Sequence, residues 1–95
     1  MHIDLDVASE QVQFESKVCI IGAGVAGLIL ARHLASRGVD VNLVEAGGCT
    51  VEPRSQEMYN VQMEGRHHDG ATEGRFRVFG GSSTRWGGQL LPLHS

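Results

Sequence analysis

Residues 17–48 read KVCIIGAGVAGLILARHLASRGVDVNLVEAGG, and they give the clearest fold signal in the chain. The stretch opens with the short apolar run Val18-Cys19-Ile20-Ile21, which is typical of a buried strand. A glycine-rich run, Gly22-Ala23-Gly24-Val25-Ala26-Gly27, follows directly, so the strand should end there and a helix begin. Val41-Asn42-Leu43-Val44 then predicts a second strand. The order strand, helix, strand predicts the βαβ unit of an α/β fold.

Each glycine of the turn has a separate task in a dinucleotide site. Gly22 permits a tight turn out of the strand, and Gly24 lets the backbone approach a pyrophosphate closely. Gly27 lets the helix lie close to the strand. At Val25 and Ala26 the helix N-terminus offers unpaired N–H groups and the positive end of the helix dipole, and both favour an anion. A pyrophosphate therefore needs no basic side chain here.

The residues after the turn keep the register of a dinucleotide-binding motif. The string fits GxGxxGxxxAx6GxxVx3E, with Ala31, Gly38, Val41 and Glu45 at the later positions. Gly38 is expected to end the helix in a left-handed conformation. Glu45 has the spacing at which a carboxylate accepts hydrogen bonds from the adenosine ribose, and its charge disfavours a 2′-phosphate. The motif therefore favours FAD or NAD over NADP.

The helix between the two strands is expected to be amphipathic. At 3.6 residues per turn its small and apolar residues share one face and its polar residues the other. The inner face would carry Gly27, Leu28, Leu30, Ala31, Leu34 and Ala35, and the outer face Arg32, His33, Ser36 and Arg37.

Length and composition exclude several classes of protein. The chain has 95 residues, fewer than one ordinary nucleotide-binding domain, and a chain of this size buries only about 60 to 65% of its unfolded surface. A net charge of −3 provides no broad basic field, so neither nucleic acid nor an anionic membrane is an expected partner. No apolar run is long enough for a signal peptide or a membrane span, which makes a cytoplasmic location the expectation.

The chain divides into a leader, residues 1–16, and an incomplete nucleotide-binding domain, residues 17–95. The alternation of Ile3, Leu5 and Val7 in the leader is compatible with a short edge strand or with a mobile segment. Within the domain, the βαβ unit covers residues 17–48.

The rest of the domain has weaker signals. Residues 49–74 are loop-rich, with a turn or two of helix expected at 55–63. Residues 75–95 open with Arg75-Phe76-Arg77-Val78-Phe79, whose alternation predicts a short, half-buried strand. A turn rich in glycine and serine follows it.

The cysteines and the paired histidines are assigned no redox or metal-binding role. Cys19 is expected to pack in its strand as a small apolar residue, and because it and Cys49 lack a CxxC spacing, both are interpreted as reduced thiols. Arg66-His67-His68-Asp69 predicts a solvated turn that ends at Gly70, since adjacent histidines point apart and no third ligand follows. No metal site is predicted.

Two linked motifs stand in order along the chain: Val44-Glu45-Ala46-Gly47-Gly48 after the glycine turn, and Phe79-Gly80-Gly81-Ser82-Ser83 with Trp86-Gly87-Gly88. Together they resemble the N-terminal end of the glucose-methanol-choline family of FAD-dependent oxidoreductases. The resemblance spans residues 17–92 and implies a partial Rossmann-like FAD-binding domain, with FAD preferred over NAD. It also implies oxidation of an alcohol or sugar CH–OH group, with hydride passing to flavin N5.

The resemblance further implies which residues hold the cofactor. They are Gly22, Gly24, Val25, Ala26, Gly27, Glu45, Ala46, Gly80, Gly81, Ser82 and Ser83. The Gly80–Ser83 turn would line the pyrophosphate and the flavin ring, and Trp86 would pack near that ring or in the core. Arg85 stands where relatives with covalent flavin carry a histidine. Because a guanidinium cannot be that nucleophile, non-covalent FAD is expected, with Arg85 paired to a phosphate or an acid.

No catalytic residue is assigned in this chain. The family's catalytic histidine and its partner come from the C-terminal part of a much longer chain, and none of His33, His67, His68 and His94 matches their context. We therefore expect an FAD-binding fragment that is inactive alone and whose partner is the missing C-terminal portion, on the same or a separate chain. Two alternatives stay open: the dinucleotide-binding part of another flavoprotein that uses NADH, and a vestigial nucleotide-binding module without turnover.

Overall fold

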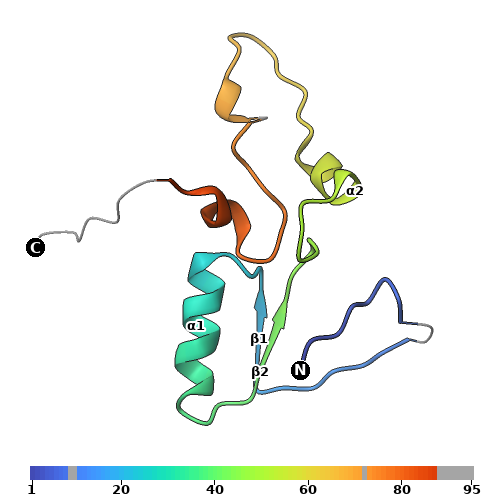
Figure 1. Ribbon diagram of the computed structural model, residues 1–95, viewed down its shortest axis with the longest axis vertical. Helices are drawn as coiled ribbons and strands as arrows, with labels where there is room; N and C mark the ends of the chain where they lie inside the picture. The colour runs from blue at the N-terminus through green and yellow to red at the C-terminus, as the bar shows by residue number, and fades with distance from the viewer. Residues whose placement is uncertain (9–10, 72, 88–95) are drawn as a thin grey trace, which may run out of the picture.

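The computed structural model describes residues 1–8, 11–71 and 73–87. Its centre is the strand β1 (Val18–Ile21), the helix α1 (Val25–Ala35) and the strand β2 (Val41–Val44) (Figure 1). The two strands pair in parallel, with Val18 opposite Val41 and Ile21 opposite Val44. The predicted order of strand, helix and parallel strand is confirmed.

Glycines flank the helix α1 at both ends. Gly24 is its N-cap residue, and the N–H of Leu28 donates to the carbonyl of Gly24 at 2.9 Å, which closes the first turn. At the other end Gly38 has φ +75° and its N–H donates to the carbonyl of Ala35 at 2.9 Å. Gly38 therefore ends the helix in the left-handed conformation that the sequence predicts.

Within the described residues, the sheet is covered on one face only. Gly27 of α1 faces Ile20, because a Cβ added at Gly27 would lie 3.4 Å from Ile20 Cγ2. Successive strand residues point to opposite faces, so Ile21 points away from α1, and its side chain is 88% exposed. Cys19 shares that open face and is exposed, so the expectation that it packs as a small apolar residue was wrong.

The apolar face of α1 is wider than the sheet that it covers. Leu28, Ala31 and Leu34 are half-buried as expected. Leu30 and Ala35, which the helical periodicity placed on the inner face, are exposed instead. Two strands offer too narrow a surface to cover the full stripe of apolar residues.

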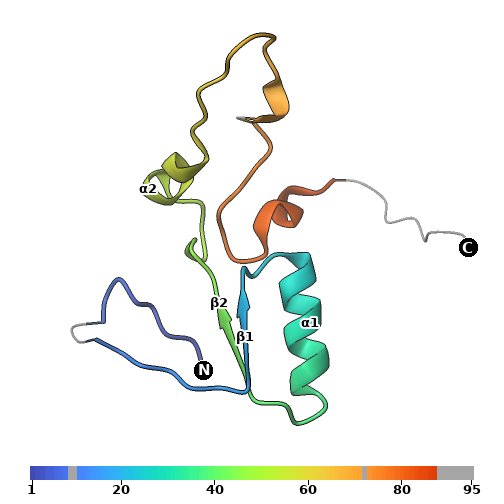
Figure 2. The same ribbon diagram turned by 180° about the vertical axis from the view of Figure 1, so that it is seen from behind.

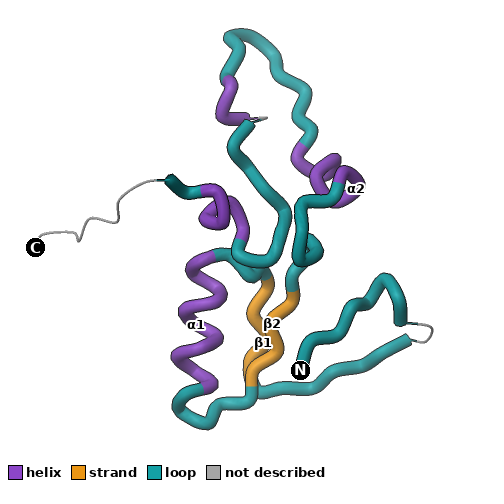
Figure 3. Tube along the Cα trace, in the orientation of Figure 1, coloured by secondary structure: helices purple, strands orange, loops and turns teal. Residues whose placement is uncertain are grey.

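The chain leaves β2 and makes a long excursion before it returns to the end of the sheet (Figures 1 and 3). The excursion contains the one-turn helix α2 (Pro53–Gln56), and a 3₁₀ turn, Glu57–Tyr59, continues it. The helix expected at 55–63 is therefore present, but it starts two residues earlier and stops at Tyr59. Pro53 at the start of α2 explains the early beginning, since proline favours the first helical position.

Residues 75–79 are not a strand, so that expectation was wrong. Their backbone groups bond to side chains and to single loop atoms: the N–H of Phe76 donates to Ser82 Oγ at 3.0 Å, and that of Phe79 donates to the carbonyl of Gly48 at 2.9 Å. The alternating pattern does mark the burial of Val78, which is 4% exposed. Together with Ile20 and Ala23, Val78 forms the buried apolar core of the described residues.

The described part of the leader contains no strand either, so the edge-strand alternative was wrong. Residues 1–8 contain a short turn at residues 5–6, where the N–H of Asp6 donates to Asp4 Oδ1 at 3.0 Å. In Figures 1 and 2 this segment lies beyond β2, on the side of the strands away from α1. Among the described residues, no helix has the length and apolar character needed to cross a membrane.

Candidate functional site

The glycine turn after β1 adopts the geometry that its sequence predicts. Gly22 has φ +101°, a conformation that favours glycine, and its N–H donates to the carbonyl of Val44 at 2.7 Å. A Cβ at Gly27 would overlap the carbonyl oxygen of Gly22, so only glycine allows α1 to approach the strand this closely. These two residues shape the fold of the turn.

Gly24 differs from its two neighbours in the motif. Its backbone is extended, at φ −74° and ψ −178°, and a Cβ there would have no heavy atom within 4 Å. The protein itself therefore does not require glycine at this position. The open space above Gly24 fits the close approach of a ligand, which is the task that the motif assigns to this glycine.

The N-terminus of α1 opens into a hollow. No side chain caps the helix, and Val25 and Ala26 are exposed. The hollow has a volume of about 520 Å³, and its lining consists of Ile20, Ile21, Gly22, Gly24, Val25, Ala26, Gly27 and Leu30. The first N–H groups of a helix have no intrahelical acceptor and carry the positive end of its dipole. The hollow can therefore hold a pyrophosphate through backbone groups alone.

Glu45 ties the end of β2 to the glycine turn. Its Oε2 accepts a hydrogen bond from the N–H of Ala23 at 2.6 Å, and its Oε1 accepts one from the N–H of Gly47 at 2.9 Å. Each carboxylate oxygen can accept a further bond, so these contacts leave capacity for ribose hydroxyls. Ala46 follows with an exposed side chain, and its carbonyl accepts from Ser55 Oγ at 3.4 Å.

The fold brings the second glycine motif onto the first. The N–H of Gly80 donates to the carbonyl of Ala23 at 2.8 Å, and a Cβ at Gly81 would lie 3.4 Å from the Cα of Gly24. The returning chain can be followed in Figure 1, where the turn lies above the start of α1. Two predicted cofactor-binding segments that are far apart in sequence thus share one end of the sheet.

The hydroxyl groups of this second turn are used internally. Gly80 and Gly81 have φ +92° and +62°, and they lead into the 3₁₀ helix Gly81–Arg85. Ser82 Oγ accepts from the N–H of Phe76, while the hydroxyl of Ser83 donates to the carbonyl of Gly80. Both serines hold the turn in shape, and their contact with a cofactor stays a prediction.

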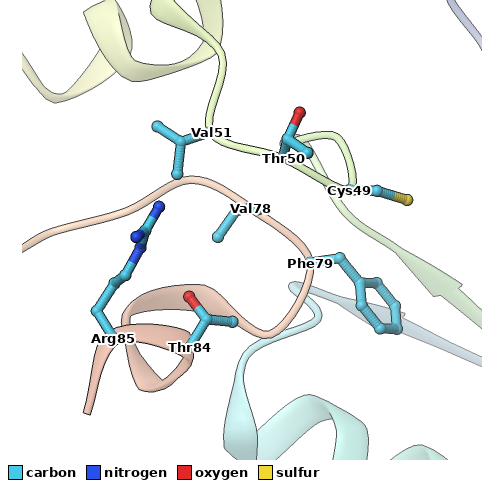
Figure 4. Close-up of a pocket in the computed structure, with 7 residues that line it drawn as sticks. All are labelled: Cys49, Thr50, Val51, Val78, Phe79, Thr84 and Arg85. Atoms are coloured by element: carbon cyan, nitrogen blue, oxygen red, sulfur yellow. The ribbon is translucent and has the colours of Figure 1, made fainter. Parts of the chain in front are cut away.

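A second, smaller hollow lies beside this turn. It has a volume of about 210 Å³ and is lined by Cys49, Thr50, Val51, Val78, Phe79, Thr84 and Arg85 (Figure 4). In Figure 4 the guanidinium of Arg85 extends from the 3₁₀ helix toward Val51. It also lies over the ring of Phe76, 5.4 Å from the ring centroid. Sequence reasoning did not predict this hollow, because it forms only where the excursion returns to the segment after β2.

Other candidate residues lie outside this cluster. Trp86 is 59% exposed, so it is not a core aromatic in the described structure. His67 Nε2 pairs with Asp69 Oδ1 at 2.7 Å, and both side chains are largely exposed. In the described ranges no three His, Cys, Asp or Glu side chains come together as metal ligands. Cys19 and Cys49 are both free thiols.

A family model described as "FAD binding domain" matches residues 15–74, which is more than half of the chain. The match covers β1, α1, β2 and the loop-rich excursion, and it ends before the Gly80–Ser83 turn. It confirms FAD as the cofactor. The matched family is not the glucose-methanol-choline family, so that resemblance is not confirmed. No curated protein and no solved structure matches the chain.

Proposed function

The chain belongs to the FAD-binding-domain family, and we propose that it is the FAD-binding segment of a flavin-dependent oxidoreductase that acts on CH–OH groups of an alcohol or a sugar. The observation that carries the proposal is the contact between its two glycine motifs. The hydrogen bond from Gly80 N–H to the carbonyl of Ala23 seats the second turn beside the start of α1. An extended cofactor that meets the helix N-terminus can reach both motifs from there.

In this proposal, different residues would bind different parts of FAD. The open face of Gly24 and the N-terminus of α1 would receive the pyrophosphate, and Glu45 would accept hydrogen bonds from the adenosine ribose. The Gly80–Ser83 turn would line the pyrophosphate and the flavin. The negative charge of Glu45 would repel a 2′-phosphate, so NADP is disfavoured.

The CH–OH substrate is the finer part of the proposal. Bound FAD would supply a hydride acceptor at flavin N5. Support for an alcohol or sugar comes from the motifs around Gly80 and Trp86, which lie outside the range matched by the family. No histidine of the described residues lies in the site: His33 is on the exposed side of α1, and His67 is in an exposed ion pair.

We further propose that turnover requires more polypeptide than this chain provides. The uncovered face of the sheet supports this, because Ile21 is 88% exposed on a strand that ends at the cofactor site. Apolar strand residues of this kind are usually covered on both faces of a parallel sheet. The same βαβ unit would serve a flavoprotein that uses NADH or a nucleotide-binding module without turnover, and these two functions are the alternatives that the experiment separates.

The experiment follows backbone amide NMR shifts of the 95-residue chain on addition of FAD, ADP or NADP. We expect FAD to shift the amides of residues 22–27 and 80–83. ADP, which has the diphosphate but no flavin, should shift mainly the first group, and NADP should cause the smallest shifts. Gly24→Val should abolish the shifts. Gly70→Val is the matched control, since Gly70 lies in a remote turn where an added Cβ meets only the flexible side chain of His68, at 3.4 Å.

Turnover is assayed on the same protein. The purified chain should be colourless and should reduce no dye with alcohols or sugars. A yellow chain with turnover would show that the FAD-binding segment is active alone, and dye reduction driven by NADH would favour the NADH-using alternative. The absence of any FAD-induced shift at residues 22–27 would refute the cofactor assignment.

A further inference from the structure

Gln56, the last residue of α2, joins two segments that are far apart in sequence. Its Nε2 donates to the carbonyl of Arg75, and its Oε1 accepts from the N–H of Arg77 at 3.2 Å. A residue on a parallel strand makes this same pair of bonds, to the carbonyl and the N–H of residues two apart. The amide of Gln56 therefore takes the place of a strand neighbour for residues 75–77.

Side chains on both flanks of Gln56 reinforce this attachment. The ring of Tyr59 lies under two guanidinium groups, with Arg75 Cζ at 4.4 Å and Arg77 Cζ at 5.5 Å from the ring centroid. On the other flank, the hydroxyl of Ser55 donates to the carbonyl of Ala46 at the end of β2. The segment 53–59 is thus held between the end of β2 and the returning chain.

The returning chain leads directly from Gln56 to the cofactor site. After Arg77 the side chain of Val78 is buried, and the N–H of Phe79 donates to the carbonyl of Gly48. The next residue is Gly80, whose N–H donates to the carbonyl of Ala23. Only two residues separate the Arg77 amide, which Gln56 holds, from Gly80.

We propose that Gln56 is a positioning residue for the second glycine turn. Its two hydrogen bonds hold the segment that seats Gly80 and Gly81 against the first turn, and through that segment they set the affinity for the flavin side of FAD. This inference rests on the proposed function, in which FAD contacts both turns. Gln56 itself makes no hydrogen bond to either turn, so its effect must pass through residues 75–80.

This role predicts a selective loss of affinity. In the proposed function ADP contacts residues 22–27 and Glu45 and meets the second turn only at its diphosphate, whereas FAD also contacts the second turn along its flavin. A loosened second turn should therefore weaken FAD binding much more than ADP binding. A residue that merely stabilises the whole fold would weaken both ligands equally.

The test compares Gln56→Met with Gln62→Met in the 95-residue chain. Methionine keeps the length of the side chain, but it has no donor and its sulfur is only a weak acceptor. Gln62 is the matched control because it is an exposed glutamine in the same excursion. Loss of two neutral hydrogen bonds should raise the dissociation constant for FAD about tenfold. The constant for ADP should change less than about twofold in both variants.

Amide hydrogen exchange gives a readout that does not depend on the cofactor. In Gln56→Met the amides of Arg77 and Gly80 should exchange faster, while the amides of β1 keep their protection. Equal loss of FAD and ADP affinity together with loss of β1 protection would assign Gln56 a general structural role and overturn the proposal. Unchanged exchange at Gly80 would overturn it as well. If the wild-type chain bound no FAD, the proposed function would fail, and the exchange at Gly80 would still decide whether Gln56 positions the turn.

Discussion

Glu45 Oε2 accepts a hydrogen bond of 2.6 Å from the backbone N–H of Ala23. The carbonyl of the same Ala23 accepts from Gly80, and the Ala23 side chain is fully buried. Ala23, a small residue inside the glycine turn, therefore connects Glu45 at the end of β2 with the second glycine motif. Changes at these positions should separate effects on the fold from effects on the cofactor.

Glu45→Ala should affect both stability and binding. It removes acceptors for the N–H groups of Ala23 and Gly47, which should lower the free energy of unfolding by about 2 kcal/mol. A denaturant titration, with amide hydrogen exchange at β1 as the readout, measures this loss. Glu45→Gln keeps one acceptor oxygen, so it should be more stable than Glu45→Ala. Because it also removes the charge, the difference in affinity between NAD and NADP should become smaller. A preference between these two nucleotides that stays unchanged in Glu45→Gln would contradict the charge argument.

Gly24→Ala and Gly27→Ala should have different effects: the first should impair FAD binding, and the second should destabilise the fold. Space is open at Gly24 and its backbone is extended, so alanine should change stability by less than about 0.5 kcal/mol while blocking the pyrophosphate. An alanine at Gly27 would overlap the carbonyl of Gly22, which should cost about 3 kcal/mol. Thermal unfolding and FAD titration of both variants make the comparison. If Gly24→Ala bound FAD like the wild type, this glycine would have no contact with the ligand.

Gly80→Ala should displace the second turn. Gly80 has φ +92°, and an added Cβ would lie 2.6 Å from Thr84 Cγ2, so alanine should cost about 1–2 kcal/mol at this position. Gly87→Ala is the control, since Gly87 has no left-handed φ and an open environment. FAD affinity should fall in the first variant and hold in the second. Equal affinities would show that FAD does not reach the second turn.

Arg85→Ala should not release a covalent flavin, because none is expected. The guanidinium lies over Phe76 beside the smaller hollow, and its chemistry does not permit it to act as a nucleophile. Denaturing electrophoresis of the assembled flavoprotein should show no fluorescent band in the wild type or in the variant. A denaturation-resistant yellow band that disappears in Arg85→Ala would refute this prediction.

The first motif was predictable because its physics is local. The positive φ of Gly22, the close packing of Gly27, the helix terminator Gly38 and the paired strands all follow from residues within one βαβ unit. The segment 75–79 was misread for the opposite reason. Its alternating pattern reports the burial of Val78, but a strand also needs a partner strand, and here the amide of Gln56 supplies the bonds.

The exposure of Leu30 and Cys19 was also beyond the reach of sequence periodicity. Periodicity tells which residues share a face, and it does not tell how much of that face a neighbour covers. A two-stranded sheet covers only part of α1, and α1 covers only one face of the sheet.

The sequence by itself determined the βαβ unit and the dinucleotide turn, because glycine spacing and strand patterning act over a few residues. Only the tertiary structure decided that Gly80 contacts Ala23, that Gln56 holds residues 75–77, and that a second hollow forms beside Arg85. These contacts join residues separated by 19 positions or more in the sequence. Their formation depends on how the whole excursion returns to the end of the sheet, and no local pattern encodes that path.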